Sequence, residues 1–459
     1  MNILILGAGQ VGSTVAYSLA REEDNNITVV DRDPELLAEL QDRLDIRTVR
    51  GYASHPDVLA QAGADAADMV IALTPSDETN MIACQICYSL FHIKTKIARV
   101  RATQYLHAKE KLFVQEALPV DMIISPEELV TNHIKLLIQY PGAVQVLDFA
   151  DSRVRMVAVR AYYGGALVGQ EIRHLREHIP DVDVRVVALY RRGQAIFPDG
   201  NTVIEADDEV FILAPRRDIR SAINELRRLD RPVRRVLIAG GGNIGVRLAQ
   251  ALENTYQVKL IERNRERARE ISEILDKTIV LHGEAADEEL LQEENIEAMD
   301  VFCAVTNAEE ANILSGMLAK RLGARKVMAI INRASYAELV HSGDIDIAIS
   351  PQQITIGALL THIRRGDIAK VHSLRRGAAE AIETVAHGDK KSSKVVGKAI
   401  EDIELPPGTT IGAIVRGDEV LMAHHDTVIQ ANDHVILFLV DRKHIPDVEQ
   451  LFQVPVSFD

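Results

Sequence analysis

Short apolar runs alternate with amphipathic stretches over the first 125 residues. The runs are rich in Val and Ile, which predicts a parallel sheet covered by helices on both faces. Strands are expected at 2–6, 27–30, 46–49, 69–73, 97–100 and 122–124. Helices are expected at 11–20, 34–44, 56–62, 78–90 and 104–116. This alternation predicts a doubly wound α/β domain with its ligand at the carboxyl ends of the strands.

The pattern changes after residue 125. Ser125 and Pro126 suit the cap and first position of a helix running to about Gln139, before Pro141 and Gly142 end it. Short strands at 154–159, 184–190 and 209–213 follow, and a helix at 218–228 closes the segment. These features predict a small α+β module.

The whole pattern then repeats. At an offset near 232 the matching pairs are Gly51 and Gly283, Asp68 and Asp300, Thr74 and Thr306, Glu78 and Glu310, Asn80 and Asn312, and Arg101 and Arg333. Ser125-Pro126 returns as Ser350-Pro351, and Asp208 as Asp433. The fold class is therefore predicted as a tandem duplication, in which each doubly wound domain is followed by a small α+β domain. The expected boundaries are 1–125, 126–142 (crossover helix), 143–230, 231–350, 351–370 (crossover helix) and 371–459.

Each half opens with G-x-G-x-x-G between an apolar strand and an amphipathic helix. The two copies are Gly7-Ala8-Gly9-Gln10-Val11-Gly12 and Gly240-Gly241-Gly242-Asn243-Ile244-Gly245. The glycines permit a tight turn, close approach of a pyrophosphate, and close packing of helix on strand. Asp31 and Glu262 end the next strand of each half, where a carboxylate that binds ribose belongs. This combination predicts two dinucleotide-binding Rossmann domains; the alternative is a structural turn.

Composition narrows the class of protein. The 459 residues are 47% hydrophobic and 26% charged, with a formal net charge of −15. The acidic balance argues against nucleic-acid binding, which needs a basic surface. The sequence has no uncharged apolar run long enough to span a bilayer, and its three cysteines and lack of a signal peptide indicate a cytoplasmic protein.

The two halves differ where phosphate is expected. Arg99 lies near the end of a first-half strand, but Ile331 takes its place in the second half. Arginine binds phosphate oxygens bidentately, so Arg99 is a candidate phosphate or partner contact; a structural salt bridge is the alternative. Thr74 and Thr306 are expected to face a ligand or to cap the following helix.

Other residue types that could carry chemistry are more simply explained by structure. Cys84 and Cys87 have C-x-x-C spacing inside an apolar helix, which favours core packing over redox or metal chemistry. His174 and His178 have the spacing of a metal pair without a third ligand, which favours a solvated helix. A basic linker of Arg227, Arg228, Arg231, Arg234 and Arg235 is expected to be solvated, with docking to an acidic surface or lipid headgroups as the alternative.

Together, the glycine motif, the following acid, T-x-x-x-E-x-N, S-P before a crossover helix and the small α+β domain resemble the RCK/KTN family of modules that regulate potassium conductance. Two such modules in one chain resemble the peripheral subunits of Trk-type potassium uptake systems. The resemblance implies a cytoplasmic ring, expected to be a homotetramer, peripheral at the inner face of the cell membrane. It also implies docking to a TrkH-like membrane potassium channel or transporter subunit, with NAD(H) and in some members ATP or ADP as ligands.

The residues expected to bind nucleotide share a position at the glycine motifs or the carboxyl edge of each sheet. In the first half they are Gly7, Gly9, Gln10, Val11, Gly12, Asp31, Arg32, Gly51, Thr74, Glu78 and Arg99. In the second half they are Gly240, Gly242, Asn243, Ile244, Gly245, Glu262 and Thr306.

The expected function is a nucleotide-sensing regulator and not an enzyme, because the small modules have no shared His, Lys or Cys in a pocket-like context that could act beside a nicotinamide. An NAD-dependent oxidoreductase and a regulator of a different cation transporter are the alternatives.

Overall fold

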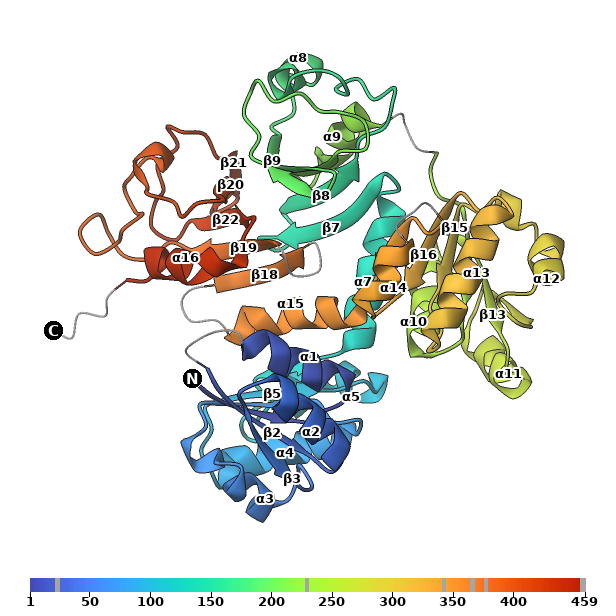
Figure 1. Ribbon diagram of the computed structural model, residues 1–459, viewed down its shortest axis with the longest axis vertical. Helices are drawn as coiled ribbons and strands as arrows, with labels where there is room; N and C mark the ends of the chain where they lie inside the picture. Colours follow the sequence, from blue (N-terminus) through green and yellow to red (C-terminus); the bar gives the residue numbers. More distant parts are fainter. Residues whose placement is uncertain (21–24, 228–230, 341–343, 364–367, 375–378, 455–459) are drawn as a thin grey trace. The chain divides into compact units, whose positions relative to one another are not determined.

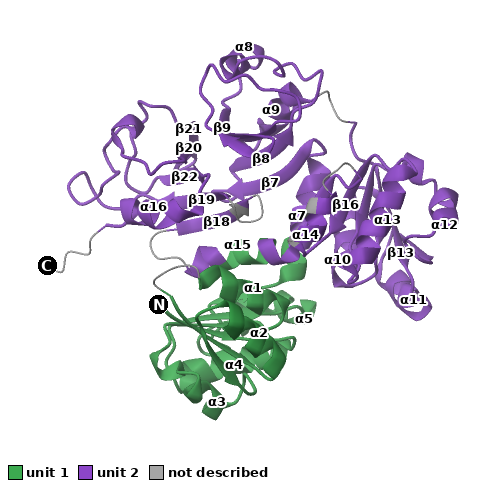
Figure 2. Cartoon of the chain, viewed as in Figure 1, with its two compact units in different colours: residues 1–129, 354–359 green, residues 130–353, 360–459 purple. Residues whose placement is uncertain are grey.

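The computed structural model describes residues 1–20, 25–227, 231–340, 344–363, 368–374 and 379–454 (Figure 1). The chain forms two compact units, residues 1–129 with 354–359 and residues 130–353 with 360–459 (Figure 2). None of the described helices is both long and apolar enough to cross a membrane.

The first unit contains a parallel sheet of six strands in the order β3-β2-β1-β4-β5-β6. Its strands are β1 (Asn2–Leu6), β2 (Asn26–Asp31), β3 (Arg47–Arg50), β4 (Met69–Ala72), β5 (Thr95–Arg99) and β6 (Met122–Ile124). Its helices are α1 (Gln10–Leu19), α2 (Pro34–Arg43), α3 (Pro56–Gln61), α4 (Asp77–Ser89), α5 (Thr103–His107) and α6 (Lys109–Leu112). The strand order reverses between β1 and β4, which confirms the predicted doubly wound fold; in such folds ligands bind at this point.

One predicted helix is wrong. The structure has α5 and α6 in place of a single helix over 104–116, separated by a turn at Ala108. Neither α5 nor α6 contains a buried residue. Helical stability in proteins comes mainly from packing of an apolar face, so this weakly anchored stretch does not sustain a longer helix.

The second unit repeats the six-stranded sheet in the order β14-β13-β12-β15-β16-β17. Its strands are β12 (Arg235–Ala239), β13 (Gln257–Glu262), β14 (Ile279–His282), β15 (Val301–Ala304), β16 (Lys326–Ile330) and β17 (Ile347–Ile349). Its helices are α10 (Asn243–Leu252), α11 (Arg265–Ile274), α12 (Glu288–Glu293), α13 (Glu309–Arg321) and α14 (Ala334–Val340). The crossover helices are α7 (Pro126–Gln139) and α15 (Pro351–Ile363), each opening on the predicted Ser-Pro.

Two antiparallel five-stranded sheets form the small domains. The first has the order β10-β9-β11-β8-β7 and the second β18-β19-β22-β20-β21, which is the same topology read from the other edge. The first contains β7 (Ala143–Phe149), β8 (Val154–Arg160), β9 (Arg185–Arg191), β10 (Gln194–Ile196) and β11 (Glu209–Pro215), with α8 (Leu175–His178) and α9 (Ile219–Leu226). The second contains β18 (Ile368–Leu374), β19 (Ala379–Val385), β20 (Thr409–Arg416), β21 (Glu419–Met422) and β22 (His434–Leu439), with α16 (Ile445–Phe452). Strands β7 and β10 were not predicted.

The two small sheets share one hydrophobic core. Phe211 of β11 and Phe438 of β22 lie in it with ring centroids 5.3 Å apart. At Gly412 an added Cβ would lie 2.7 Å from Leu213 Cδ2 and 2.8 Å from Val187 Cγ1, so only glycine permits this close packing. The small domains therefore stabilise each other within one chain.

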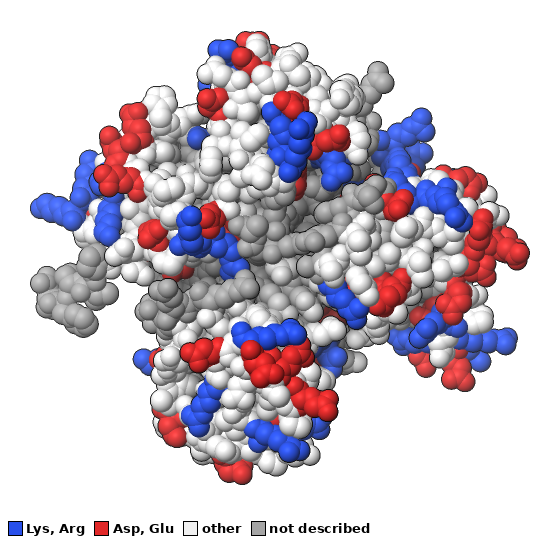
Figure 3. All heavy atoms as spheres, in the orientation of Figure 1, with Lys and Arg blue, Asp and Glu red and all other residues white. Residues whose placement is uncertain are grey.

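The linker before the second sheet is anchored through its backbone. Arg234 and Arg235 donate their N–H groups to Asp300 Oδ2, at 2.6 and 2.9 Å. The side chains of Arg231, Arg234 and Arg235 are exposed, as expected of a solvated linker, and Arg228 lies outside the described residues. For Arg227 the expectation is wrong, because its guanidinium is partly buried over the Tyr162 ring, 4.4 Å from the ring centroid. On the face drawn in Figure 3, acidic and basic side chains are interspersed.

The repeated Asp208 and Asp433 hold matching ion pairs. Arg191 donates to both carboxylate oxygens of buried Asp208 at 2.9 and 2.8 Å, and Arg416 does the same to Asp433. Each carboxylate also accepts a backbone N–H at 2.7 Å, from Glu205 or from Gln430. The repeat at these positions is therefore explained by one structural network made twice.

We predict that Asp208→Ala lowers the free energy of unfolding of the small-domain pair by about 3 kcal/mol, because it removes the buried partner of the Arg191 guanidinium and leaves the backbone N–H of Glu205 unpaired. The matched control is Asp418→Ala, since Asp418 is fully exposed at 3.6 Å from Arg153; its loss should stay below about 0.5 kcal/mol. Urea denaturation measures both, and equal losses would contradict the interpretation.

Candidate nucleotide-binding sites

The G-x-G-x-x-G turn of each half is called a glycine corner. In the first corner, Gly7, Gly9 and Gly12 have three different structural roles. Gly7 has φ +109°, which L side chains rarely adopt. A Cβ at Gly12 would lie 1.9 Å from the carbonyl oxygen of Gly7, so helix α1 packs against the turn only without a side chain there. A Cβ at Gly9 would meet nothing within 4 Å. The open space is therefore at the middle glycine, where the motif expects a pyrophosphate.

The second corner has the same construction. Gly240 has φ +113°, Gly245 would clash with the carbonyl of Gly240 at 1.9 Å, and Gly242 again faces open space. Helix α1 starts at Gln10 and helix α10 at Asn243. By helix geometry, the first-turn N–H groups of Gln10, Val11, Asn243 and Ile244 have no intrahelical acceptor, so they can bind an anion.

The predicted acids are fixed against their glycine corners. Asp31 Oδ2 accepts the Ala8 N–H at 2.6 Å, and its Oδ1 accepts the Asp33 N–H at 2.9 Å. Glu262 accepts from Gly241 at 2.8 Å and from Asn264 at 2.7 Å. A carboxylate oxygen can accept a second hydrogen bond, so both acids retain capacity for ribose hydroxyl groups.

Gly51 and Arg32 flank the first acid. Gly51 donates its N–H to the carbonyl of Asp31 at 2.9 Å, and an added Cβ would lie 2.6 Å from Val58, which gives this glycine a packing role. The guanidinium carbon of Arg32 lies 5.6 Å from the centroid of the Tyr52 ring.

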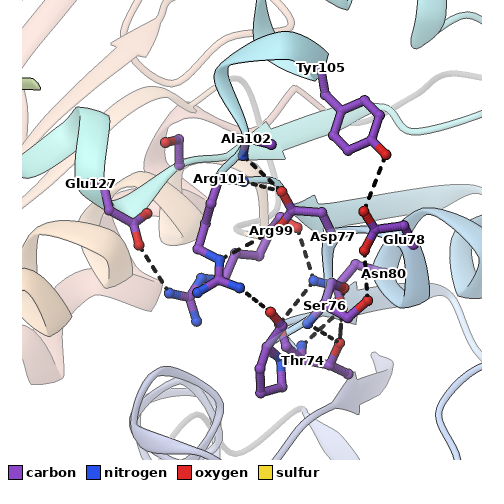
Figure 4. Close-up of polar contacts among 12 residues, drawn as sticks. Thr74, Ser76, Asp77, Glu78, Asn80, Arg99, Arg101, Ala102, Tyr105 and Glu127 are labelled. Atoms are coloured by element: carbon purple, nitrogen blue, oxygen red, sulfur yellow. Dashed lines mark hydrogen bonds and ion pairs between the residues drawn. The ribbon is translucent and has the colours of Figure 1, made fainter. Parts of the chain in front are cut away.

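The Thr74 loop is held by its own polar network (Figure 4). The Thr74 hydroxyl donates to Asn80 Oδ1 at 2.7 Å, and buried Asn80 donates to the carbonyls of Thr74 and Arg99 at 3.1 and 2.9 Å. Ser76, not Thr74, caps α4 by accepting the Thr79 N–H at 3.1 Å. Thr74 therefore ties the end of β4 to the end of β5.

Glu78 belongs to the same network. Its carboxylate accepts from Ser76 Oγ at 3.0 Å and from the Tyr105 hydroxyl at 3.2 Å. Its own backbone N–H, Ser76 and Tyr105 lower the pKa of Glu78 below its usual value. The structure gives this exposed residue a scaffold role, and contact with nucleotide stays a prediction.

Sequence reasoning missed Asp77, which accepts the N–H groups of Arg101 and Ala102 at 2.9 and 2.8 Å. Its counterpart Glu309 accepts the Arg333 N–H at 2.7 Å. The acidic residue at matching places in the two halves was the signal that could have found this contact.

The second half repeats the threonine network. The Thr306 hydroxyl donates to Asn312 Oδ1 at 2.6 Å, and Asn312 donates to the carbonyl of Ile330 at 3.1 Å. Helix α13 has Ala308 at its N-cap without a side-chain capping bond. The shared Thr-Asn pair is thus explained by loop structure in both halves.

Arg99 lies at the carboxyl end of β5 and pairs with Glu127 in the first turn of α7 (Figure 4). The Nη2–Oε1 distance is 3.4 Å, and both side chains are largely buried. Arg99 Nε and Glu127 Oε2 are buried without a hydrogen-bond partner among the described residues. The pair is therefore a structural salt bridge with unused polar atoms at the ligand-binding edge of the sheet.

The cysteines and the histidine pair have structural surroundings. Cys84, Cys87 and Cys303 are buried free thiols. Burial raises the pKa of Cys84 above its usual range and the pKa values of Cys87 and Cys303 to about 12. His174 lies in a 3-10 turn, and His178 Nδ1 lies 3.0 Å from Glu225, so the expected solvated helix is replaced by separate local contacts.

The two halves match known domain families over most of their length. Residues 3–126 and 236–351 match the TrkA-N domain, and residues 156–227 and 389–453 match the TrkA-C domain. The chain belongs to the TrkA family. The Trk system potassium uptake protein TrkA of Halomonas elongata is 63% identical over 458 residues, covering 100% of both chains. The TrkA protein of Vibrio alginolyticus is 60% identical over 453 residues, covering 99% of each chain.

Solved structures agree on the fold of this TrkA-family chain. The GsuK RCK domain has a TM-score of 0.63 at 17% identity, covering 98% of this chain and 94% of that one. The GsuK channel bound to NAD has a TM-score of 0.61 at 18% identity, covering 98% and 78%. Family membership groups the chain with components of a potassium uptake system, and not with the oxidoreductases that share its nucleotide-binding fold.

We predict that the three thiols resist iodoacetamide at pH 8 in the folded protein. Raising a thiol pKa to about 12 leaves a thiolate fraction of about one in 10⁴ at that pH, and burial blocks access as well. Mass spectrometry should detect alkylation only after urea denaturation. Rapid labelling or a Cys84–Cys87 disulfide in the native protein would favour the redox alternative.

Proposed function

We propose that this chain is a nucleotide-sensing regulatory subunit that gates a membrane potassium channel or transporter. One observation carries the proposal: both halves place an open middle glycine, free helical N–H groups and a fixed carboxylate on one sheet edge. The chain is similar over its whole length to a potassium uptake protein. In such a protein, a nucleotide bound at these features would regulate transport and would not be a substrate.

The residues at the corners fit an adenine dinucleotide. Pyrophosphate would lie over Gly9 or Gly242 against the first-turn N–H groups, and ribose hydroxyls would bind Asp31 or Glu262. NAD(H) is the proposed ligand, with ATP and ADP as further candidates; NAD is bound in the related GsuK channel. Phosphate number changes the charge at the helix N-terminus, so different nucleotides would favour different shapes of the protein.

A connected set of contacts supports transmission from the first site. Thr74, Asn80 and the carbonyl of Arg99 link β4 to β5, and the Arg99 side chain then reaches Glu127 at the start of α7. A nucleotide shifts an equilibrium only by binding one state more tightly, typically by about 1–3 kcal/mol. A phosphate that competes with Glu127 for Arg99 would supply such a difference.

The second half lacks this link. The sequence pairing of Arg99 with Ile331 is wrong by one residue: Ile330 ends β16 as Arg99 ends β5, and its carbonyl accepts from Asn312 as that of Arg99 does from Asn80. Ile330 thus replaces Arg99 and Gln352 replaces Glu127, so both members of the ion pair are absent together. We propose that the first half carries the regulatory coupling. The chain would act as a ring of four copies at the cytoplasmic face of the membrane, docked to a TrkH-like subunit; a monomer by light scattering would contradict the ring.

Single-site variants test nucleotide binding. Gly9→Asp and Gly242→Asp fit without a clash, because each Cβ faces open space and the N-cap backbone is extended. The new carboxylate would cap the helix and repel pyrophosphate. Calorimetry should show each variant losing one of two NAD- or ADP-binding events, with unchanged thermal stability. Two intact binding events in either variant would contradict the proposed site.

Coupling is tested by Glu127→Gln. We expect nucleotide affinity to change by less than about threefold, while nucleotide no longer alters potassium flux through the membrane subunit co-purified with the chain and reconstituted in vesicles. Arg99→Ala should also uncouple flux, and it should weaken binding if the guanidinium contacts phosphate; unchanged affinity would remove that role. Glu128→Gln is the matched control on the next residue. Failure to recover any potassium-conducting subunit would contradict the function.

A further inference from the structure

An exposed aromatic stack lies beside the first acid. The Tyr52 and His55 rings are stacked with centroids 4.9 Å apart and an interplanar angle of 25°. Arg32 lies over the Tyr52 ring, which is 55% exposed. Tyr52 directly follows Gly51, whose N–H binds the carbonyl of Asp31. The stack is therefore continuous with the carboxylate expected to hold ribose.

The residue at the N-cap of helix α3 takes part in the stack and does not cap the helix. His55 occupies its N-cap position and makes no side-chain capping hydrogen bond. In the second half the matching residue, Asp287, accepts the N–H groups of Glu289 and Leu290 at 3.0 and 3.3 Å. A capping side chain stabilises a helix. Because the His55 imidazole stacks on Tyr52 and does not cap, α3 lacks the stabilisation that Asp287 gives to α12 in the second half. Such departures from local rules are expected at functional sites.

The second sheet keeps the backbone but changes the chemistry. Gly283 donates to the carbonyl of Glu262 at 3.1 Å, as Gly51 does to Asp31. Glu284 replaces Tyr52 and Asp287 replaces His55, while His282 stands where the first half has Arg50. Arg263 keeps the position of Arg32, so the aromatic pair of the first half corresponds to two carboxylates in the second.

We infer that the Tyr52–His55 stack with Arg32 is an adenine platform, which makes the first corner the stronger adenine-nucleotide site and the second the weaker one. This inference rests on the proposed function. With pyrophosphate over Gly9 and ribose at Asp31, the base extends past the acid to the side flanked by Arg32 and Tyr52. A base stacked on an aromatic ring gains affinity, and a neighbouring guanidinium adds a cation–π contribution. Arg263 stands in the place of Arg32 in the second half, but Glu284 and Asp287 offer no ring for the base to stack on and repel an anionic ligand.

Affinity tests the platform in chains that carry Gly242→Asp, which leaves only the first corner able to bind. Tyr52→Ala should raise the Kd for ADP at least about tenfold by calorimetry, as expected for loss of one base–aromatic stack. Tyr52→Phe, the conservative variant, should stay within about twofold. Because Tyr52 is exposed, neither variant should lower the thermal midpoint. Equal Kd values for the parent and Tyr52→Ala would overturn the inference.

Fluorescence gives a second readout, because the chain contains no tryptophan. Tyr52→Trp in the Gly242→Asp chain introduces a single reporter, and saturating ADP should quench its emission by stacking of the base. The matched reporter is Glu284→Trp in a Gly9→Asp chain; if a tryptophan there restores a platform, its ADP affinity should exceed that of Glu284→Ala. Unchanged emission from the Tyr52→Trp chain at saturating ADP would overturn the inference. If the unsubstituted chain binds neither ADP nor NAD, the proposed function itself fails.

Discussion

Everything at the two candidate sites depends on how closely a helix can approach the turn before it. At Gly12 and Gly245 a single added carbon would lie 1.9 Å from the carbonyl oxygen of the first glycine. This contact sets the start of α1 and α10 relative to β1 and β12, and with it the direction of the unpaired N–H groups. Asp31 and Glu262 then bind the same turn, so the corner and its acid form one rigid construction.

The duplication separates scaffold from ligand chemistry within one chain. Positions that both halves share, such as Asp68 and Asp300 or Asn80 and Asn312, make the same structural hydrogen bonds in each. Positions that differ gather at the carboxyl edges: Arg99 and Ile330, Glu127 and Gln352, Tyr52 and Glu284. The shared residues maintain the fold, while the differing ones would assign unequal roles to the two sites.

Much of this architecture could be predicted from apolar periodicity and glycine spacing, because buried parallel strands and G-x-G-x-x-G corners are local patterns. Strand β7 was missed because Gln145 and Asp148 interrupt its apolar run, although it forms a hairpin with β8. The three-residue strand β10 is too short for a periodic signal. Arg99 could be singled out from the sequence because the second half has no arginine at the matching position. Its partner Glu127 could not, because 28 residues separate the two. The Tyr52–His55 stack could not be predicted, because a single exposed tyrosine belongs to no periodic pattern or motif.

The central claim is that a nucleotide bound at these corners changes the conformation of the protein and is not chemically converted. Hydrogen–deuterium exchange of the full-length protein, with the nucleotide recovered afterwards, tests it most directly. We predict that ADP or NAD changes amide exchange at the Thr74 loop and in the first turn of α7, and is recovered chemically intact. A nucleotide converted to product, or exchange that changes only at the glycine corners, would contradict the account.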